Sequence, residues 1–555
     1  MALLEPLYRV SEICAYRGIE NVVICPGSRS AALTLAFVRN KKFRIRVITD
    51  ERSAAFTALG MAQVSGKPTV LICTSGTAAL NFSPAVAEAY FQGIPLLVLT
   101  ADRPPEWINQ HDGQTIFQQN IYGRHIVRSY DFPADYTHPD AVWMMERQTH
   151  EAIAYTRQGP VHLNVPVREP FYPAEGEAYD GVFRPLSYLN GTPVLEDSSW
   201  KELAEVWNRA NNILIAVGQN HEDLDASLAA LSEDPRVTIL ADVISNAGVK
   251  NKITAHDIFL GKAHGLTPPD LLITCGKSFI SKPFKQFFRK HKSAAHWHVE
   301  DGTALTDPLQ SITARITVPA GYFLEELERR NTVRPRGTGG ELTGKKAWER
   351  LEAAAETYLA RFLEACAFGE LKATALLFQH LRAGDALHLG NSMPVRYANL
   401  LGSLLPEGVK VFSNRGTSGI EGVVSTAVGQ SLAHEGRVHC IVGDVSFFYD
   451  SNALFAARPD NLSIYLIQNG GGNIFRIIEG PGKQEELESC FITAPGRTAE
   501  GLCREAGYRY TAVRSEEELR TALKNKEGGC ALFEIYVDGV QDSGLFQQLK
   551  AGFNL

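Results

Sequence analysis

The sequence predicts three doubly wound α/β domains, each with a parallel β-sheet covered by helices on both faces. Short apolar runs alternate with helical patterns along the chain, which is typical of parallel sheets. These runs repeatedly end in polar turns rich in Gly, Ser and Asp. A length of 555 residues also fits three or four domains at about 150 residues each.

The first domain is predicted over residues 1–178. Its strand candidates are Val22–Ile24, Ile45–Thr49, Thr69–Cys73 and Leu96–Thr100. Helices are predicted from about Ala31 and over Ser53–Val64. Ligands of parallel α/β sheets bind at the carboxyl ends of strands, so the polar turns after these four runs are candidate parts of a site.

Two further α/β units follow, separated by two predicted linkers. Residues 175–195 are rich in Pro, Gly and Tyr, and Asn331–Lys345 is rich in Arg, Gly, Thr and Pro, which favours loops. The middle domain is predicted over 190–332, with strands at Ile213–Val217, Val237–Leu240 and Leu271–Cys275. The third domain is predicted over 345–555, with strands at Ala386–Leu389, Val409–Phe412, Val438–Val442, Ser463–Gln468 and Ala531–Val537.

Composition argues against several classes of protein. The chain has 55 Lys and Arg against 62 Asp and Glu, a net charge of −7, which argues against a nucleic-acid partner. No apolar run reaches about 18 residues, so no membrane span is expected. The first residues lack a basic segment followed by an apolar one, so no signal peptide is expected. Nine scattered cysteines without a CxxC pair predict reduced thiols in a cytoplasmic protein.

The third domain contains the most specific local motif. One predicted strand ends in Gly443-Asp444-Val445-Ser446, and another ends in Asn469-Gly470-Gly471. Carboxylate, amide and carbonyl oxygens are the hard ligands that Mg²⁺ prefers, and glycine lets a backbone approach a diphosphate closely. The simpler alternative is a helix-capping Asp and an unrelated Gly-rich turn.

This pattern resembles the metal and diphosphate motif of thiamine diphosphate (ThDP) enzymes. The resemblance implies that ThDP is bound through Mg²⁺, with Mn²⁺ as an alternative. Its metal ligands would be Asp444, Asn469 and the carbonyl of Gly471, with Gly443, Val445 and Ser446 at cofactor-binding positions. Many ThDP enzymes have a second Asn where this chain has Gly470.

Glu51 follows the second predicted strand and precedes an Ala-rich helix. Alone, a Glu at a helix N-terminus is explained by the helix macrodipole. Its place resembles that of the ThDP-enzyme carboxylate that hydrogen-bonds the aminopyrimidine N1′ and sustains the imino tautomer. The resemblance then covers the chain as pyrimidine-binding, central and diphosphate-binding domains. It implies a homodimer or homotetramer whose active sites lie at the subunit interface, with Glu51 and the metal on different chains.

Arginines recur at four predicted strand ends, namely Arg29, Arg103, Arg396 and Arg415. The planar guanidinium suits bidentate recognition of a carboxylate, so the four together favour a substrate with several carboxylates. A single arginine of this kind is more often a surface charge or half of an ion pair.

Two of these segments, Pro26-Gly27-Ser28-Arg29-Ser30 and Ala101-Asp102-Arg103-Pro104-Pro105-Glu106, closely resemble the MenD family, the ThDP-dependent synthases of 2-succinyl-5-enolpyruvyl-6-hydroxy-3-cyclohexene-1-carboxylate (SEPHCHC). The resemblance implies decarboxylation of 2-oxoglutarate. It further implies conjugate (1,4) addition of the succinyl-semialdehyde-type carbanion to isochorismate. The products would be SEPHCHC and CO₂, in menaquinone biosynthesis.

The resemblance also implies a role for each matching residue. Arg396 and Arg415, with Ser392 beside them, would hold the 2-oxoglutarate-derived carboxylate. The isochorismate positions would be Ser28, Arg29, Arg103, Gln114 and Lys282. Ile420 would prop the cofactor in its bent form, and Ile474 and Phe475 would form the wall near the thiazolium. The predicted catalytic set is Glu51, Arg29, Arg103, Gln114, Arg396 and Arg415.

The sequence departs from the family pattern at two positions near the residues predicted to bind isochorismate. Pro283 follows Lys282 where the family often has a second basic residue, and Gly113 stands where an Asn is familiar. Lys285 could supply the missing charge.

Two alternatives stay open at this point. One is another ThDP-dependent 2-oxoacid decarboxylase or synthase, and the other is a non-catalytic ThDP-fold binding protein. The middle domain has only the short glycine turn Ala216-Val217-Gly218-Gln219 and not a full dinucleotide fingerprint, so no flavin is expected.

Overall fold

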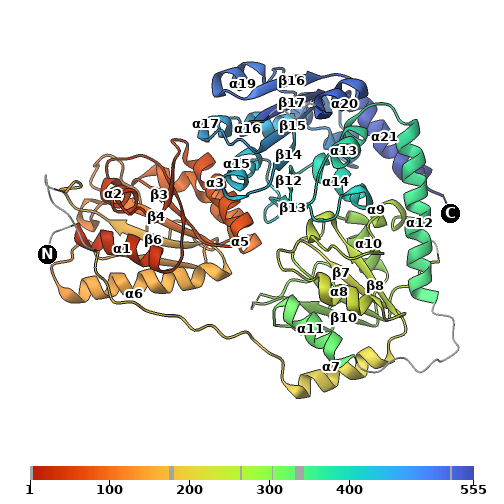
Figure 1. Cartoon of the computed structure of the whole chain (residues 1–555), viewed down its shortest axis with the longest axis horizontal. Coiled ribbons are helices and arrows are strands. Elements are labelled where there is room, and N and C mark those ends of the chain that lie inside the picture. Colours follow the sequence, from red (N-terminus) through yellow and green to blue (C-terminus); the bar gives the residue numbers. More distant parts are fainter. Residues whose placement is uncertain are drawn as a thin grey trace.

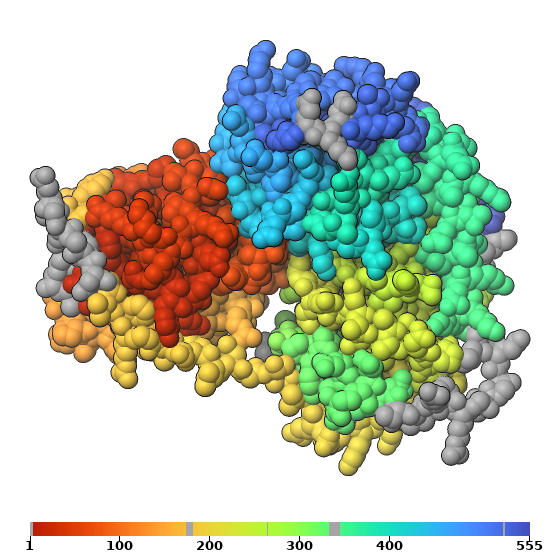
Figure 2. Space-filling view, viewed as in Figure 1, coloured from red at the N-terminus to blue at the C-terminus, as the bar shows by residue number. Residues whose placement is uncertain are grey.

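The computed structural model describes residues 4–173, 181–262, 265–302, 304–331, 343–524 and 528–554. Three α/β domains follow one another along the chain (Figure 1). Every strand pair in the three sheets is parallel. The predicted fold class is therefore confirmed. In the space-filling view, the third domain, cyan to blue, contacts both other lobes (Figure 2).

The first sheet has the strand order β2-β1-β3-β4-β6-β5. Its strands are β1 (Asn21–Ile24), β2 (Arg44–Val47), β3 (Thr69–Cys73), β4 (Leu96–Asp102), β5 (Arg128–Asp131) and β6 (Val161–Pro166). Its helices are α1 (Glu5–Tyr16), α2 (Ala31–Arg39), α3 (Glu51–Ser65), α4 (Thr77–Asn81), α5 (Ser83–Gln92) and α6 (Pro139–Tyr155). Val22 and Val23 belong to different hydrophobic clusters because successive side chains of a strand point to opposite faces. The central strands β1, β3, β4 and β6 are thus buried on both sides, whereas the edge strands β2 and β5 are more exposed.

The middle sheet has the order β11-β10-β9-β7-β8. Its strands are β7 (Ile213–Val217), β8 (Val237–Ala241), β9 (Leu271–Cys275), β10 (Ala295–Val299) and β11 (Ala314–Ile316). Its helices are α7 (Asp197–Arg209), α8 (Asp225–Ser232), α9 (His256–Phe259), α10 (Lys282–Lys290) and α11 (Ala320–Arg330). Ile213 and Leu214 again point into different clusters, so this sheet is also covered on both faces.

The third sheet has the order β13-β12-β14-β15-β17-β16. Its strands are β12 (Ala386–Leu389), β13 (Lys410–Ser413), β14 (Val438–Gly443), β15 (Leu462–Gln468), β16 (Arg509–Val513) and β17 (Ala531–Tyr536). Its helices are α13 (Glu370–Phe378), α14 (Met393–Leu400), α15 (Val423–Ala433), α16 (Asp444–Tyr449), α17 (Ala453–Ala456), α18 (Ile474–Ile477), α19 (Glu500–Ala506), α20 (Glu516–Lys524) and α21 (Gly539–Gly552). The long helix α12 (Thr343–Ala365) packs against α9 and β8 of the middle domain, and it runs along the outer side of both domains (Figure 1).

The first and third domains meet through α3 and α15, which pack closely along their length. A Cβ added at Gly60 would lie 2.0 Å from the carbonyl oxygen of Thr426, and one at Gly429 would lie 2.0 Å from that of Thr57. Two glycines therefore allow the two backbones to approach each other. This contact fixes how the two domains sit relative to one another.

Several strands were not predicted. β5 and β16 are edge strands with mostly polar sequences, Arg-Ser-Tyr-Asp and Arg-Tyr-Thr-Ala-Val. β6 and β10 include buried polar residues such as His162 and His296, and β11 has only three residues. Short or polar strands lack the apolar run from which a strand is predicted.

Two predicted strand ends were also displaced. β4 continues to Asp102, because Ala101 and Asp102 pair with β6. β2 ends at Val47 rather than Thr49, because Asp50 caps α3 by accepting a hydrogen bond from the backbone N–H of Ser53 at 3.0 Å. Glu51 is therefore the first residue of α3 and does not end the strand.

The described part of the first predicted linker, 181–195, contains no helix or strand, and its remaining residues lie outside the described ranges. Most of the second, 332–342, also lies outside them. Among the described residues, no helix is both long enough and apolar enough to cross a membrane.

Candidate active site

Asp444 and Asn469 follow two neighbouring strands of the third sheet, β14 and β15. One carboxylate oxygen of Asp444 accepts from the backbone N–H of Val445 at 2.7 Å. The other accepts from the N–H groups of Gly470 and Gly471, at 2.9 Å each. Burial raises the pKa of Asp444, and these N–H groups oppose the shift. The structure thus brings the three residues predicted to bind the metal to one strand edge.

Asn469 presents an unpaired oxygen at this edge. Its Nδ2 donates to a carboxylate oxygen of Glu370 at 3.3 Å, while its Oδ1 is buried without a hydrogen-bond partner among the described residues. Leaving a buried polar atom unpaired costs about 1–3 kcal/mol. A divalent cation would satisfy that oxygen, so the donor set of carboxylate, amide and carbonyl oxygens fits Mg²⁺.

The two glycines after Asn469 adopt backbone conformations that favour glycine. Gly470 has φ +79° and Gly471 has φ +122°, and a Cβ at Gly471 would lie 2.2 Å from the carbonyl oxygen of Ile492. Left-handed φ values are tolerated by Gly and, among other residues, best by Asn and Asp. This explains why Gly470 can stand where many ThDP enzymes have a second Asn.

The remaining residues predicted to bind the cofactor lie around the same edge. Gly443 is the N-cap of α16, and a Cβ there would meet nothing within 4 Å. The hydroxyl of Ser446 donates to the carbonyl oxygen of Ile420. Ile420 is 41% exposed, so it is not a core residue of its own chain. Phe475 packs against Phe491 with 5.6 Å between ring centres, and Ile474 packs against the core of the third domain.

Glu51 lies in a different place within the same chain. It lines a cavity of about 470 Å³ together with Asn81, Asn452 and Phe455. Among the described residues, none of those predicted to bind the metal lines this cavity.

Arg396 and Arg415 are two partly buried cations near the turns after β12 and β13. Arg396 donates to the carbonyl oxygen of Ser392, and Arg415 donates to Oδ1 of Asn391 at 3.1 Å. Burial lowers the pKa of both guanidinium groups, and the Arg415 charge lowers that of Arg396 further. Within the described ranges, neither has an acidic side chain at ion-pair distance. Partly buried cations without an ion-pair partner favour an anionic ligand.

Ser392, whose carbonyl oxygen accepts from Arg396, has φ +70° and ψ −122°. This conformation is strained for a residue with a side chain, and such strain clusters at functional sites.

On the first domain, two arginines lie near each other. Arg29 is buried, donates to the carbonyl oxygen of Val167 at 2.9 Å and stacks over the ring of Phe171. Burial and the nearby Arg103 charge lower the pKa of Arg29. Arg103 pairs with Asp112 at 2.6 Å and donates to the carbonyl oxygen of Gly113 at 2.8 Å.

The other residues predicted to bind isochorismate are open to solvent. Ser28 is exposed, and Gln114 is exposed with φ +56°. Lys282 is the first residue of α10 and is also exposed. One turn later, Lys285 is partly buried and donates to the carbonyl oxygen of Phe279 at 3.0 Å. Burial and the nearby Arg415 charge lower the pKa of Lys285, so this lysine adds positive charge beside Arg415.

Two family models match the first and middle domains. Residues 9–121 match the family model "Thiamine pyrophosphate enzyme, N-terminal TPP binding domain". Residues 186–383 match "Middle domain of thiamine pyrophosphate".

Curated relatives extend the similarity to nearly the whole chain. The 2-succinyl-5-enolpyruvyl-6-hydroxy-3-cyclohexene-1-carboxylate synthase of Cytophaga hutchinsonii is 39% identical over 561 aligned residues, covering 99% of this chain and 98% of the relative. The chain belongs to the SEPHCHC synthase family. The synthases of Porphyromonas gingivalis and Flavobacterium psychrophilum are each 36% identical, covering 91% and 93% of this chain and 89% and 92% of those proteins.

In this member of the SEPHCHC synthase family, sequence reasoning missed Glu370, the partner of Asn469. The two residues are 99 positions apart, and Glu370 belongs to no local motif. Burial raises the pKa of Glu370 well above its usual range. By accepting from Nδ2, Glu370 fixes which end of the Asn469 amide faces the predicted metal-binding edge.

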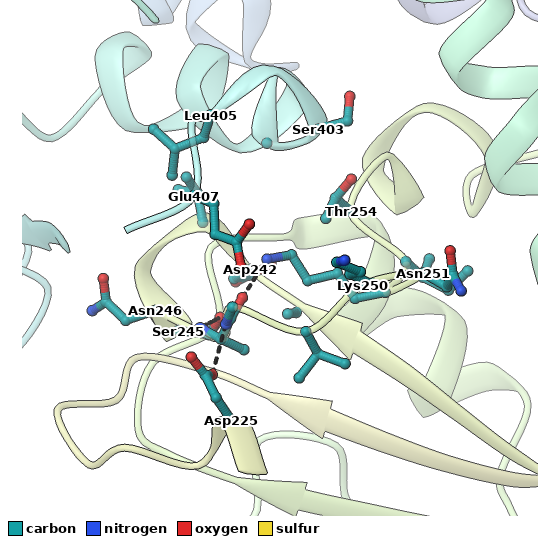
Figure 3. Close-up of a pocket in the computed structure, with 18 of the residues that line it drawn as sticks. Asp225, Asp242, Ser245, Asn246, Lys250, Asn251, Thr254, Ser403, Leu405 and Glu407 are labelled. Carbon is teal, nitrogen blue, oxygen red and sulfur yellow. Dashed lines mark hydrogen bonds between the residues drawn. The ribbon is translucent and has the colours of Figure 1, made fainter. Parts of the chain in front are cut away.

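A larger cavity, of about 820 Å³, lies between the middle and third domains. Figure 3 shows Asp225 and Asn246 on its middle-domain side, and Ser403 and Leu405 on its third-domain side. Asp225 accepts from the backbone N–H of Gly248 at 2.7 Å, so its carboxylate holds the neighbouring turn. Among the described residues, none predicted for the SEPHCHC synthase site lines this cavity.

Proposed function

We propose that this chain is a SEPHCHC synthase of menaquinone biosynthesis. It decarboxylates 2-oxoglutarate with ThDP and Mg²⁺ and adds the remaining four-carbon unit to isochorismate by conjugate (1,4) addition, releasing CO₂. The observation that carries the proposal is the full-length similarity to proteins with that name. The family models named for thiamine pyrophosphate support the cofactor.

The arginines support the choice of substrates. 2-Oxoglutarate and isochorismate each have two carboxylates, and a bidentate guanidinium contact suits each carboxylate. The partly buried pair Arg396 and Arg415 is assigned to 2-oxoglutarate. Arg29 and Arg103, with Ser28, Gln114 and Lys282, are assigned to isochorismate. Lys285, beside Arg415, adds positive charge where Pro283 replaces a basic residue.

Mg²⁺ would be held by Asp444, the unpaired Oδ1 of Asn469 and the carbonyl oxygen of Gly471. Mn²⁺ could take the same oxygens. The diphosphate would lie against Gly443, Val445 and Ser446, where the turn is open. When bound, ThDP supplies a thiazolium ring that takes up the electron pair released as CO₂ leaves.

The side chains of the protein hold protons and charges around that chemistry. With the cofactor bound, Glu51 would hold the proton at N1′ of the aminopyrimidine, which favours its imino tautomer. Ile420 would support the cofactor, and Ile474 and Phe475 would shield the reacting carbon from water. The arginines hold the substrate carboxylates in place, so binding energy is used for orientation.

The proposal includes a homodimer or homotetramer whose sites combine Glu51 of one chain with Asp444 of another. The separate cavity of Glu51 within one chain supports it. The test mixes Glu51→Gln protein with Asp444→Asn protein after mild dissociation. Mixed dimers regain activity if the two residues come from different chains, because one of their two sites is then intact. Absence of any regained activity in verified mixed dimers would overturn the shared site.

We also place the enzyme in the cytoplasm, because its nine cysteines are free, as is usual for proteins kept in a reducing compartment.

The decisive experiment combines the protein with ThDP, Mg²⁺, 2-oxoglutarate and isochorismate. CO₂ release coupled to loss of the isochorismate absorbance is the expected result. Release of CO₂ from pyruvate, with 2-oxoglutarate inert, would overturn the assignment in favour of another 2-oxoacid decarboxylase or synthase.

A further inference from the structure

The turn after β13, residues 414–422, contains Arg415 and is held by a carboxylate of the first domain. Glu88 on α5 accepts from the backbone N–H of Gly416 at 2.7 Å and of Thr417 at 2.6 Å. It also accepts from the Thr417 hydroxyl at 2.5 Å and from Nε2 of Gln92 at 2.5 Å. The bonds to the turn join residues that lie more than 300 positions apart in the sequence.

Glu88 is only 1% exposed. Burying a carboxylate is costly unless it is paired or fully hydrogen-bonded. Within the described ranges, no lysine or arginine forms an ion pair with Glu88. Its donors are mainly the backbone and hydroxyl of the arginine-bearing turn, so that turn compensates the buried charge. A carboxylate is required here, because an amide in its place would direct an N–H group at another N–H.

The turn also packs directly against α5. A Cβ at Gly416 would lie 2.8 Å from the carbonyl oxygen of Glu88 and 3.1 Å from Cβ of Phe91. Gly416 therefore allows the backbone of the turn to reach the Glu88 carboxylate. Figure 1 shows α5 and β13 beside each other where the first and third domains meet.

The start of the turn is held by side chains of two other domains. The carbonyl oxygen of Ser413 accepts from Nε2 of Gln92 at 3.3 Å and from Nε2 of Gln219 at 3.2 Å. Gln219 also donates to Oε1 of Gln92 at 2.9 Å. Within the third domain, Asn391 accepts from Arg415 and donates to the carbonyl oxygen of Asn414 at 2.7 Å. Residues on both sides of Arg415 are thus fixed, and the position of its guanidinium follows from them.

We propose that Glu88 is a positioning residue for Arg415, through which the first domain of a chain sets the 2-oxoglutarate site of its own third domain. This inference rests on the proposed function. Glu88 does not touch the substrate in this role.

The proposal predicts that removing the Glu88 carboxylate selectively lowers the affinity and the specificity of the enzyme for 2-oxoglutarate. If Arg415 binds the carboxylate at the far end of 2-oxoglutarate, its misplacement raises the KM for that substrate. Turnover of 2-oxopentanoate, which has the same length without the second carboxylate, should change little. A misplacement of about 1 Å can cost on the order of 10²-fold.

The experiment uses the full-length enzyme loaded with ThDP and Mg²⁺ and compares Glu88→Gln with wild type. Glu202→Gln is the matched control, because Glu202 is an exposed carboxylate on α7. The expected result is a 2-oxoglutarate KM raised by about 10–10²-fold, with ThDP affinity within about twofold. The preference for 2-oxoglutarate over 2-oxopentanoate should fall by the same factor as the KM rises.

If Glu88→Gln does not fold, Thr417→Val removes one donor to the carboxylate and keeps Glu88. It should shift the KM and the preference in the same direction by a smaller factor. Unchanged values in a folded variant would overturn the proposal. An equal loss for both substrates together with weaker ThDP binding would overturn it too, because that pattern indicates general damage. Wild-type protein without 2-oxoglutarate turnover would overturn the proposed function first, and this inference with it.

Discussion

The first and third domains have the same strand order but different polar turns. Numbered within each domain, both sheets read 2-1-3-4-6-5. The helix after the second strand, α3 in one domain and α15 in the other, forms the contact between the two. In the first domain that helix begins shortly after β2 and starts with Glu51. In the third domain a longer turn with Arg415 separates β13 from α15.

This difference indicates which part of each domain determines its function. The shared strand order sets which turns lie at one edge, and the residues in those turns set the chemistry. The third and fourth strands of the third domain end in Asp444 and Asn469, whereas those of the first end near Thr74 and Arg103. In the proposed division of roles, the first domain provides Glu51 for the proton chemistry and binds isochorismate. The third domain binds the metal and 2-oxoglutarate.

The largest effect is expected at Glu51. Glu51→Gln removes the charge that holds the proton at N1′ and keeps the size of the side chain. Turnover should fall by about 10²–10⁴-fold, the range for a lost acid–base group. ThDP binding, followed by fluorescence quenching, should persist. Normal turnover in this variant would break the assignment of proton chemistry to the first domain.

A crossed pair of variants separates the two substrate sites. In Arg415→Ala the 2-oxoglutarate KM should be raised by about 30–4,000-fold, since truncating one partner of a buried charge contact costs about 2–5 kcal/mol. Arg103→Ala should act on the isochorismate KM instead, and by less, because Arg103 already has a partner in Asp112. Steady-state kinetics with each substrate varied in turn decides this. If both variants raised the same KM, the division between the domains would be wrong.

Metal binding should depend on the third domain alone. Asp444→Asn should weaken binding of Mn²⁺, measured by electron paramagnetic resonance in the presence of ThDP, by at least about tenfold, since even changes around a metal ligand cost 10–100-fold. Asp102→Asn is the control, because Asp102 is a buried carboxylate at the end of a strand of the first sheet. Equal loss in both variants would contradict the assigned site.

The contact between the domains can be weakened without touching either site. Gly60→Ala places a Cβ against the carbonyl oxygen of Thr426, and overpacking of this kind costs about 1–3 kcal/mol. The thermal unfolding midpoint should therefore fall. Gly501→Ala on α19 is the control, because a Cβ there meets nothing within 4 Å and alanine favours a helix. A Gly60→Ala midpoint equal to that of wild type would show that the helices separate easily.

Part of this organisation could be predicted from the sequence, because the motifs are local. Gly443-Asp444 and Asn469 sit at the ends of apolar runs, so the strands and the metal-binding edge follow from short segments. β5 and β16 were not predictable in the same way, since their polar sequences form strands only through pairing with distant partners.

The same limit applies to the candidate site. Glu370 and Glu88 act on Asn469 and on the Arg415 turn across large sequence separations, and nothing local marks them. In the sequence, Lys285 was noticed only because Pro283 takes the place of a basic residue. Its position beside Arg415 depends on the fold and could not be predicted from the sequence.

The smallest effect is expected at Gly470, where the backbone of the metal-binding turn can be tested apart from its ligands. Gly470 has φ +79°, and a Cβ there meets nothing within 4 Å. The only cost of a side chain at this position is therefore that of the left-handed backbone conformation. Asn tolerates this conformation better than other residues do. Gly470→Asn should therefore leave Mn²⁺ affinity within about twofold and change the free energy of unfolding by less than about 1 kcal/mol. Gly470→Val, with a β-branched side chain, should destabilise the turn and weaken metal binding. Equal tolerance of both variants would mean that the backbone conformation at residue 470 does not fix the position of Asn469.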